Sequence, residues 1–170
     1  MLARLNISFL LLASACSGAF PSPALDLPRA RTQIDNINTK LSRWYLNEQL
    51  DSVALTYARD GILMGPNAQP AEGRAAIKTA WGGLAATHRL QFVLQTTDLL
   101  GADSVLLERG RYALRFLPKG SADTATMIPD DHGSYVVGWI HREGRWQIKF
   151  DIAVSDGPPG SGTLAGRPAP

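Results

Sequence analysis

The stretch that decides the fold is YARDGILMGPNAQPAEGRAAI, residues 57–77. A helical pattern ends at Gly61, and the three apolar residues after it predict a short strand. Pro66 and Pro70 then bracket a polar loop, and a new helical pattern begins at Gly73. The loop is therefore either an edge of a binding or catalytic site or only a connection between packed elements.

Helical periodicity predicts three helices in the first half of the chain. One begins near Thr32, a shorter one covers Leu50 to Ala58, and a third covers about Gly73 to Leu84. The short strand, Ile62 to Met64, lies between the second and the third. The apolar positions that define the first helix are Ile34, Ile37, Leu41, Trp44 and Tyr45.

The second half changes to a period of two, which is typical of strands. Four β-rich runs follow one another: HRLQFVLQTTDLLG, SVLLERGRYALRFL, GSYVVGWIH and RWQIKFDIAVS. Turn signals join them at 101–103 and 143–144, and a longer polar loop covers 117–132. Three helices followed by a four-strand antiparallel meander indicate an α+β fold, with the helices on one face of a bent sheet.

The two ends of the chain predict export and flexible segments. Arg4, an apolar run and small residues up to Cys16 form an export signal, and LASAC resembles a bacterial lipoprotein box. Cys16 is then either lipidated or removed with the signal, so we expect a periplasmic protein, a membrane-anchored lipoprotein or a secreted protein. The predicted limits are 1–19 for the signal, 20–28 for a tether, 29–156 for the domain and 157–170 for a disordered tail.

Composition excludes several classes of function. The 170 residues carry a formal net charge of +2 without a basic cluster, which argues against nucleic acid as a partner. Cys16 is the single cysteine, so the domain has no disulfide, thiolate metal site or cysteine nucleophile. No glycine-rich phosphate loop or serine elbow occurs, and we predict no cofactor. The run DDH at 130–132 has no ligand-like spacing to His88 or His141, so we predict no metal site.

Three stretches carry a family resemblance: residues 50–81, residues 107–116 (LERGRYALRF) and residues 133–156. Together they resemble the nuclear transport factor 2-like superfamily, which includes ketosteroid isomerases and SnoaL-like cyclases. They are most similar to its domain of unknown function 4440. The resemblance implies a cone-shaped α+β fold, with three N-terminal helices packed on a bent antiparallel sheet, and a homodimer formed through the sheet. Because this fold hosts enzymes, binding proteins and assembly modules, it does not imply one activity.

The ketosteroid isomerase residues are not reproduced here. The family's general base directly precedes a proline, and that position is Gly65, with Met64 before it. The family's oxyanion tyrosine corresponds to Leu41, and its second oxyanion acid falls near Tyr135 or Val136. The resemblance therefore does not support the isomerase mechanism.

Glu108 is the first candidate for a catalytic acid or base. Strict alternation along 105–116 places Glu108 on the more apolar face of its strand, with Leu106 and Tyr112. A desolvated carboxylate of this kind can transfer protons. The alternative is a salt bridge between Glu108 and a neighbouring arginine near the rim of the cone.

Asp151 is the second candidate, with an unsettled orientation. Alternation along Trp146 to Val154 places Asp151 with Lys149, opposite the apolar stripe that includes Phe150 and Ile152, unless a bulge resets the register. The run DIAVSD matches a recurrent ending in the resembling family, which keeps Asp151 as a candidate.

Seven further residues are predicted to line an apolar cavity suited to a small hydrophobic or aromatic ligand. They are Trp44, Tyr57, Met64, Trp81, Tyr112, Tyr135 and Trp139. Three functions follow as hypotheses: binding of such a ligand, cofactor-free isomerase, cyclase or dehydratase chemistry with Glu108, or a dimerising accessory module. An exposed apolar stripe on the outer sheet face would favour the third.

Overall fold

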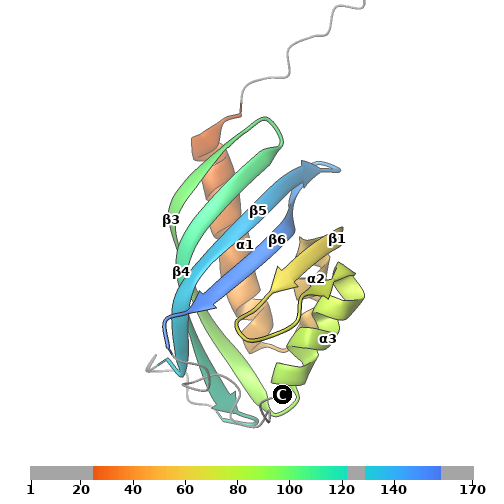
Figure 1. Cartoon of the computed structure of the whole chain (residues 1–170), viewed down its shortest axis with the longest axis vertical. Coiled ribbons are helices and arrows are strands. Elements are labelled where there is room, and N and C mark those ends of the chain that lie inside the picture. The colour runs from red at the N-terminus through yellow and green to blue at the C-terminus, as the bar shows by residue number, and fades with distance from the viewer. Residues whose placement is uncertain (1–24, 122–128, 158–170) are drawn as a thin grey trace, which may run out of the picture.

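The computed structural model describes residues 25–121 and 129–157 (Figure 1). The whole predicted export signal with Cys16, residues 20–24 of the predicted tether, and the tail from residue 158 lie outside the described residues. The helices are α1 (Leu27–Leu46), α2 (Leu50–Thr56) and α3 (Gly73–Ala85). The strands are β1 (Tyr57–Met64), β2 (Ala71–Glu72), β3 (His88–Ala102), β4 (Val105–Pro118), β5 (Asp131–Arg142) and β6 (Arg145–Ser155).

The strands form one six-stranded sheet in the order β2-β1-β6-β5-β4-β3. The predicted antiparallel meander is confirmed as β3 to β6. The short strand joins it as well, because β1 runs parallel to β6, so the sheet is mixed. Figure 1 shows the long strands bending together, with α1 behind them and α2 and α3 gathered beside β1. This is the predicted α+β architecture, with helices on one side of a bent sheet.

The first helix begins earlier than predicted. Asp26 caps it, since the Asp26 carboxylate accepts a hydrogen bond of 3.0 Å from the backbone N–H of Arg29. Pro28 fits the first turn, where no intrahelical donor is needed. Leu27 and Pro28 are therefore helical and do not belong to a tether.

The prediction that Gly61 ends the second helix is wrong. The helix α2 stops at Thr56, and Gly61 lies inside β1. A Cβ at Gly61 would lie 2.9 Å from the carbonyl oxygen of Ile148 on β6. Glycine is needed here because the parallel strands approach closely, not because a helix ends.

The hairpin turn predicted at 143–144 is confirmed, whereas the one predicted at 101–103 occurs at 103–104, because Gly101 and Ala102 are still paired with β4. Glu143 and Gly144 join β5 to β6 with φ of +53° and +73°, as a two-residue hairpin requires. Asp103, with φ of +51°, lies between β3 and β4. Of the predicted loop 117–132, residues 122–128 lie outside the described part of the chain.

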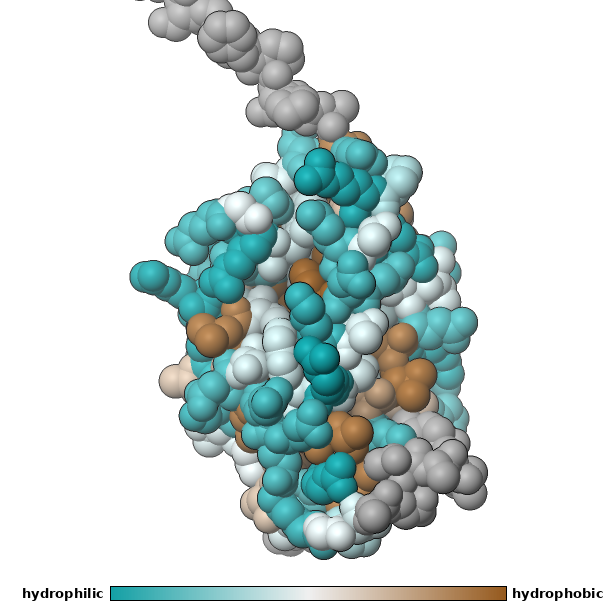
Figure 2. Space-filling model, turned by 180° about the vertical axis from the view of Figure 1, so that it is seen from behind, coloured by the Kyte–Doolittle hydropathy of each residue, from teal (hydrophilic) through white to brown (hydrophobic). Residues whose placement is uncertain are grey.

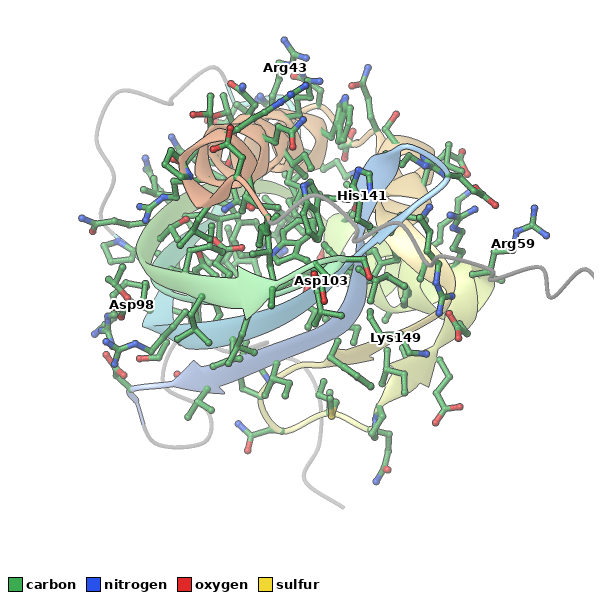
Figure 3. All side chains as sticks on the ribbon, turned by 90° about the horizontal axis from the view of Figure 1, so that it is seen from above. Arg43, Arg59, Asp98, Asp103, His141 and Lys149 are labelled. Carbon is green, nitrogen blue, oxygen red and sulfur yellow. The ribbon has the colours of Figure 1, made fainter. Side chains whose placement is uncertain are left out.

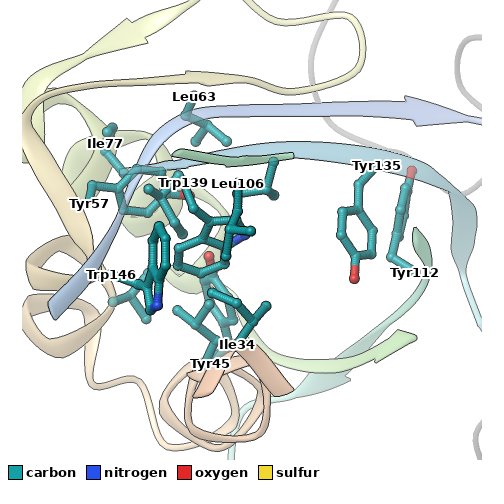
Figure 4. Packing of buried hydrophobic residues seen from close by; sticks show 14 of the residues in the cluster. Ile34, Tyr45, Tyr57, Leu63, Ile77, Leu106, Tyr112, Tyr135, Trp139 and Trp146 are labelled. Atoms are coloured by element: carbon teal, nitrogen blue, oxygen red, sulfur yellow. The ribbon is translucent and has the colours of Figure 1, made fainter. Parts of the chain in front are cut away.

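The core lies between α1 and the inner face of the sheet. In Figure 4, Ile34 and Tyr45 rise from α1 toward Leu106 and Trp139 of the sheet. Tyr57 and Trp139 are fully buried. Burial of these large side chains supplies most of the driving force for packing the helix on the strands.

Charged side chains occupy the outside of the domain. Figure 3 shows Arg43, Arg59 and Asp98 pointing away from the ribbon. Figure 2, seen from behind so that α1 faces the viewer, shows a mostly hydrophilic surface with separate hydrophobic patches. No helix within residues 25–121 and 129–157 is both long and apolar enough to cross a membrane.

Candidate functional site

A cavity of about 1220 Å³ lies between the helices and the inner face of the sheet. Its wall is mainly apolar, with a few polar groups, which is the usual make-up of a small-molecule site. The aromatic residues that line it are Tyr45, Trp81, Phe92, Tyr112, Phe116, Tyr135 and Trp139.

Four of the seven predicted lining residues lie on this wall: Trp81, Tyr112, Tyr135 and Trp139. Figure 4 shows Tyr112 and Tyr135 side by side, apart from the Trp139 group. The other three do not line the cavity. Trp44 is half-buried against the core, Tyr57 is fully buried, and Met64 is half-buried at the end of β1.

The loop between β1 and β2 forms part of the cavity rim. Its contributing residues are Gly65, Pro66, Ala68, Gln69 and Pro70. The loop is thus an edge of the cavity as well as a connection, and its residues offer no side chain that could transfer a proton at neutral pH.

Glu108 is completely buried, on the inward face that alternation predicted. Four neutral groups donate hydrogen bonds to its carboxylate. Its Oε1 accepts from Asn38 Nδ2 at 2.8 Å, Thr96 Oγ1 at 2.7 Å and the Tyr135 hydroxyl at 2.7 Å. Its Oε2 accepts from Trp139 Nε1 at 2.8 Å.

This arrangement suits an ionised carboxylate, which only accepts hydrogen bonds. Trp139 Nε1 can only donate, so a proton on Oε2 would face another donor. In the described part of the chain, no arginine is bonded to Glu108, which differs from the salt bridge considered from the sequence. Glu108 is also not among the residues that line the cavity, so it acts on the site through Tyr135, Trp139 and Asn38, which are.

The position of Asp151 follows from a bulge. In the β5–β6 ladder, Gly138 pairs with Phe150 and Trp139 pairs with Ile148, so Lys149 is the extra residue. The bulge resets the alternation that the sequence suggests. Phe150 and the apolar positions after it on the same face are exposed, and Asp151 turns to the cavity wall.

Asp151 has an acid–base character that its surroundings explain. Its Oδ2 accepts a hydrogen bond of 2.5 Å from the hydroxyl of Tyr57. Burial raises the pKa of Asp151 to about 6, the Tyr57 hydrogen bond opposes this rise, and the charge of Glu108 adds to it. Burial, followed by the charge of Asp151, also raises the pKa of Tyr57 well above its ordinary value. Near neutral pH, Asp151 can thus both accept and release a proton.

A second polar group lies at another part of the wall. The Tyr112 hydroxyl donates to Asp131 Oδ2 at 2.8 Å, and Ser155 Oγ donates to Asp131 Oδ1 at 2.5 Å. Burial, and then the hydrogen bond to Asp131, raise the pKa of Tyr112. Tyr112 therefore stays a neutral hydroxyl bound to a carboxylate, a structural pair that also reaches the cavity.

The histidines do not converge. His88 lies at the cavity wall, His132 faces Asp156 across 3.9 Å, and His141 contacts Trp146 edge to face with ring centroids 5.0 Å apart. Across residues 25–121 and 129–157, no group of three or more His, Cys, Asp or Glu side chains is arranged to hold a metal ion.

The chain matches no protein-family model and no curated protein. Its resemblance is to solved structures. One is a nuclear transport factor 2-like protein with a cystatin-like fold from Novosphingobium aromaticivorans, with a TM-score of 0.64 and 13% identity over 79% of this chain and 88% of that one. The chain has the nuclear transport factor 2-like fold.

Two more structures share this nuclear transport factor 2-like fold. One, from Novosphingobium aromaticivorans, is provisionally named a scytalone dehydratase; it has a TM-score of 0.65 and 15% identity over 84% of this chain and 97% of that one. The other is a Catenulispora acidiphila protein in complex with S-DNPA, with a TM-score of 0.62 and 14% identity over 76% and 95%. At these identities the likeness concerns the fold alone, and the narrower resemblance to domain of unknown function 4440 stays a prediction.

Sequence reasoning missed several residues of the nuclear transport factor 2-like cavity. Tyr45 and Leu41 line it from α1, although the sequence treated them as core positions. Asn38 and Thr96 bind Glu108 from α1 and β3. The one available signal was Asn38 itself, a polar residue one turn before Leu41 on the apolar face of its helix.

Proposed function

We propose that this chain binds a small, largely apolar or aromatic molecule in the cavity of its nuclear transport factor 2-like fold. The observation that carries the proposal is a cavity of about 1220 Å³ with aromatic walls and few polar groups. The similar structure from Catenulispora acidiphila, which is in complex with S-DNPA, supports the proposal.

The test of this function places a large side chain in the cavity. Ala153 lies at the cavity wall, whereas its neighbour Val154 is 62% exposed on the outer face. We expect 2-tetralone, an aromatic ketone, to raise the thermal unfolding midpoint of the purified chain, since a ligand of the folded state stabilises it. Ala153→Phe should abolish this rise and Val154→Phe should not. Equal shifts in the two variants would place binding elsewhere.

A second candidate function is cofactor-free proton transfer of the isomerase, cyclase or dehydratase kind. It is favoured by Asp151, whose pKa of about 6 suits a general base and whose carboxylate lines the cavity, whereas Glu108 does not. We expect the wild-type chain to exchange the acidic C–H protons of 2-tetralone for deuterium in D₂O, as followed by NMR. Asp151→Asn should stop the exchange and retain the thermal shift. Binding without exchange in the wild type would leave the binding function alone.

A third candidate is a homodimer or accessory module that uses the outer sheet face. Exposed apolar side chains occur there on β4 and β6, the two strands on either side of β5: Val105, Leu107, Phe150, Ile152 and Val154. Burying such a face would stabilise an assembly. Sedimentation of the wild type and of Ile152→Asp tests it: a dimer that dissociates in the variant supports the interface, and a monomeric wild type excludes it.

We also propose export with lipidation at Cys16. The proposal rests on the signal-like run that ends at LASAC. Labelling of cells with a radioactive fatty acid should mark the wild-type chain and leave Cys16→Ser unmarked. An unmarked wild-type chain in the soluble exported fraction would favour simple release.

A further inference from the structure

The charged side chains that line the cavity are mainly acidic. Asp130, Asp131 and Asp151 line it, and among the described residues no lysine or arginine does. The chain as a whole carries a formal net charge of +2, so the cavity has the opposite sign. His88 is the one basic side chain of the described wall.

Elsewhere on the domain, acidic side chains have cationic partners. Lys149 binds Asp60 at 2.8 Å, and Arg109 and Asp98 form an exposed ion pair. These pairs lie on the outside and keep the cations there. The cavity carboxylates have neutral partners instead: hydroxyl groups bind Asp131 and Asp151, and the backbone N–H of Phe116 binds Asp130.

Among the described residues, two wall carboxylates each accept a single hydrogen bond: Asp130, which is exposed to water, and Asp151, which is only partly exposed. The Tyr57 hydroxyl binds one oxygen of Asp151, and the other has no partner recorded within residues 25–121 and 129–157. Among the described residues, no cationic side chain offsets the cost of removing this carboxylate from water, and Glu108 adds a repulsive charge. A positive charge placed in the cavity would relieve both.

Aromatic rings surround the same end of the cavity. Tyr45 contacts Trp81 and Phe92 with ring centroids 4.7 Å away in each case, and Trp81 and Phe92 are 5.6 Å apart. Asp151 lines the same cavity as these three rings and accepts a hydrogen bond from Tyr57, and its charge raises the pKa of both Tyr45 and Tyr57. Aromatic faces attract cations within about 6 Å of the ring centroid.

The indole N–H of Trp81 belongs to the same cluster. It lies close enough to the Tyr57 oxygen to lower the pKa of Tyr57, although its geometry does not complete a hydrogen bond. A contact of such poor alignment contributes little. The end of the cavity thus combines an under-bonded carboxylate with three rings.

We propose that the ligand of this cavity is an organic cation, a small amine or ammonium ion with an apolar or aromatic body. Its charge lies between Asp151 and the Tyr45–Trp81–Phe92 rings, and its body fills the apolar remainder. This inference rests on the proposed binding function and specifies its ligand class. An organic anion is disfavoured by the wall carboxylates, and a neutral ligand leaves Asp151 uncompensated.

The experiment compares molecules of one shape and different charge. Benzyltrimethylammonium and its neutral carbon analogue neopentylbenzene are titrated into the purified chain at pH 8, with benzenesulfonate as the anion. We expect the cation to bind about tenfold or more tightly than the neutral analogue, and the anion not to bind at about 1 mM. Asp151→Asn should remove the preference for the cation and should still bind neopentylbenzene with unchanged affinity. Asp98→Asn, on the exposed surface, should change neither affinity.

A pH series provides a second readout that does not depend on a variant. The titratable groups facing Asp151 are Tyr57 from β1, Tyr45 from α1, Glu108 from β4 and Tyr135 from β5. Because the pKa of Asp151 is about 6, the preference for the cation should be smaller at pH 5 than at pH 8 in the wild type. In Asp151→Asn the preference should be weaker and should change little with pH.

Each result decides one of the two proposals. Equal affinity for the cation and the neutral analogue, or tighter binding of the anion, would overturn the cation inference and keep the cavity function. Binding of none of the three molecules, with Ala153→Phe indistinguishable from wild type, would overturn both.

Discussion

Glu108 and Asp151 occupy one row of the sheet and have opposite surroundings. Both pair with Val137, Glu108 from β4 and Asp151 from β6, so their Cα atoms lie about 10 Å apart, two strand spacings. Both face inward. Glu108 accepts four hydrogen bonds, whereas Asp151 accepts one.

The difference separates a structural carboxylate from a chemically available one. The charge of Glu108 is stabilised by donors that were themselves removed from water, and its removal would leave these donors unpaired. Asp151 lacks such donors, and its charged form is costly until a ligand or a proton arrives. Both side chains are carboxylates on the inner face, but Glu108 is completely buried and Asp151 is half-buried, so the number of donors and the access to the cavity together separate their roles.

The largest expected effect follows from emptying the Glu108 site. Glu108→Ala should lower the free energy of unfolding by about 4 kcal/mol or more, because it leaves four buried donors without an acceptor. Glu108→Gln keeps the size but turns an amide NH₂ toward donors, and should cost about 2–3 kcal/mol. Urea unfolding measures both. Glu143→Gln, in the exposed β5–β6 turn, is the control, and a Glu108→Gln value within about 0.5 kcal/mol of it would remove the structural role.

A glycine keeps one of these donors in place. A Cβ at Gly110 would lie 2.3 Å from Cζ of Tyr135 and 2.4 Å from its hydroxyl oxygen. Gly110→Ala should therefore displace the Tyr135 hydroxyl from Glu108 and cost about 2–3 kcal/mol in urea unfolding. Gly83→Ala is the matched control, since no atom lies within 4 Å of its added Cβ, and it should be neutral or stabilising. Similar losses in both would mean that Tyr135 adapts freely.

Asp151 should behave in the opposite way to Glu108. Its folded pKa of about 6 lies above the ordinary 3.8, so its contribution to stability is fully present below pH 3.8 and lost as pH rises through 6. Asp151→Asn should match the wild type at pH 4 and exceed its unfolding free energy at pH 8 by at most about 3 kcal/mol. Urea unfolding at the two pH values measures this. Asp103→Asn, in the β3–β4 turn, should show no such divergence, and an Asp151→Asn variant less stable than wild type at pH 8 would contradict the comparison.

The orientation of Glu108 could be read from the sequence and that of Asp151 could not. Alternation is a local property of β4, and its ladder with β5 is regular around Glu108. Asp151 depends on the bulge at Lys149, where the Lys149 side chain binds the carbonyl oxygen and carboxylate of Asp60 on β1. Lys149 and Asp60 are 89 positions apart in the sequence, so no local pattern in RWQIKFDIAVS could predict their contact.

The same distinction holds for the partners of Glu108 and for the sheet as a whole. Asn38 lies 70 positions from Glu108, so the sequence predicted a buried acid without its donors. The helices and the meander follow local periodicity and were predicted. The parallel pairing of β1 with β6 joins distant segments and was missed. Local patterns determine elements and faces, and tertiary pairing determines which polar groups meet.

The smallest effect is expected at an acid that is neither bound by buried donors, as Glu108 is, nor placed at the cavity wall, as Asp151 is. Asp98 forms an exposed ion pair with Arg109, and hydrogen bonding from Arg109 lowers the pKa of Asp98. Water solvates this carboxylate whether or not the arginine is present. Asp98→Asn should therefore have the same thermal unfolding midpoint as the wild type, within error, at low salt and at high salt. Its contribution, where measurable, would be present above pH 3.8 and fall as pH drops, opposite in sign to that of Asp151. If Asp98→Asn instead changed stability with pH as Asp151→Asn does, the effect would belong to any aspartate of this fold. The small number of hydrogen-bond donors around Asp151 would then not explain its behaviour.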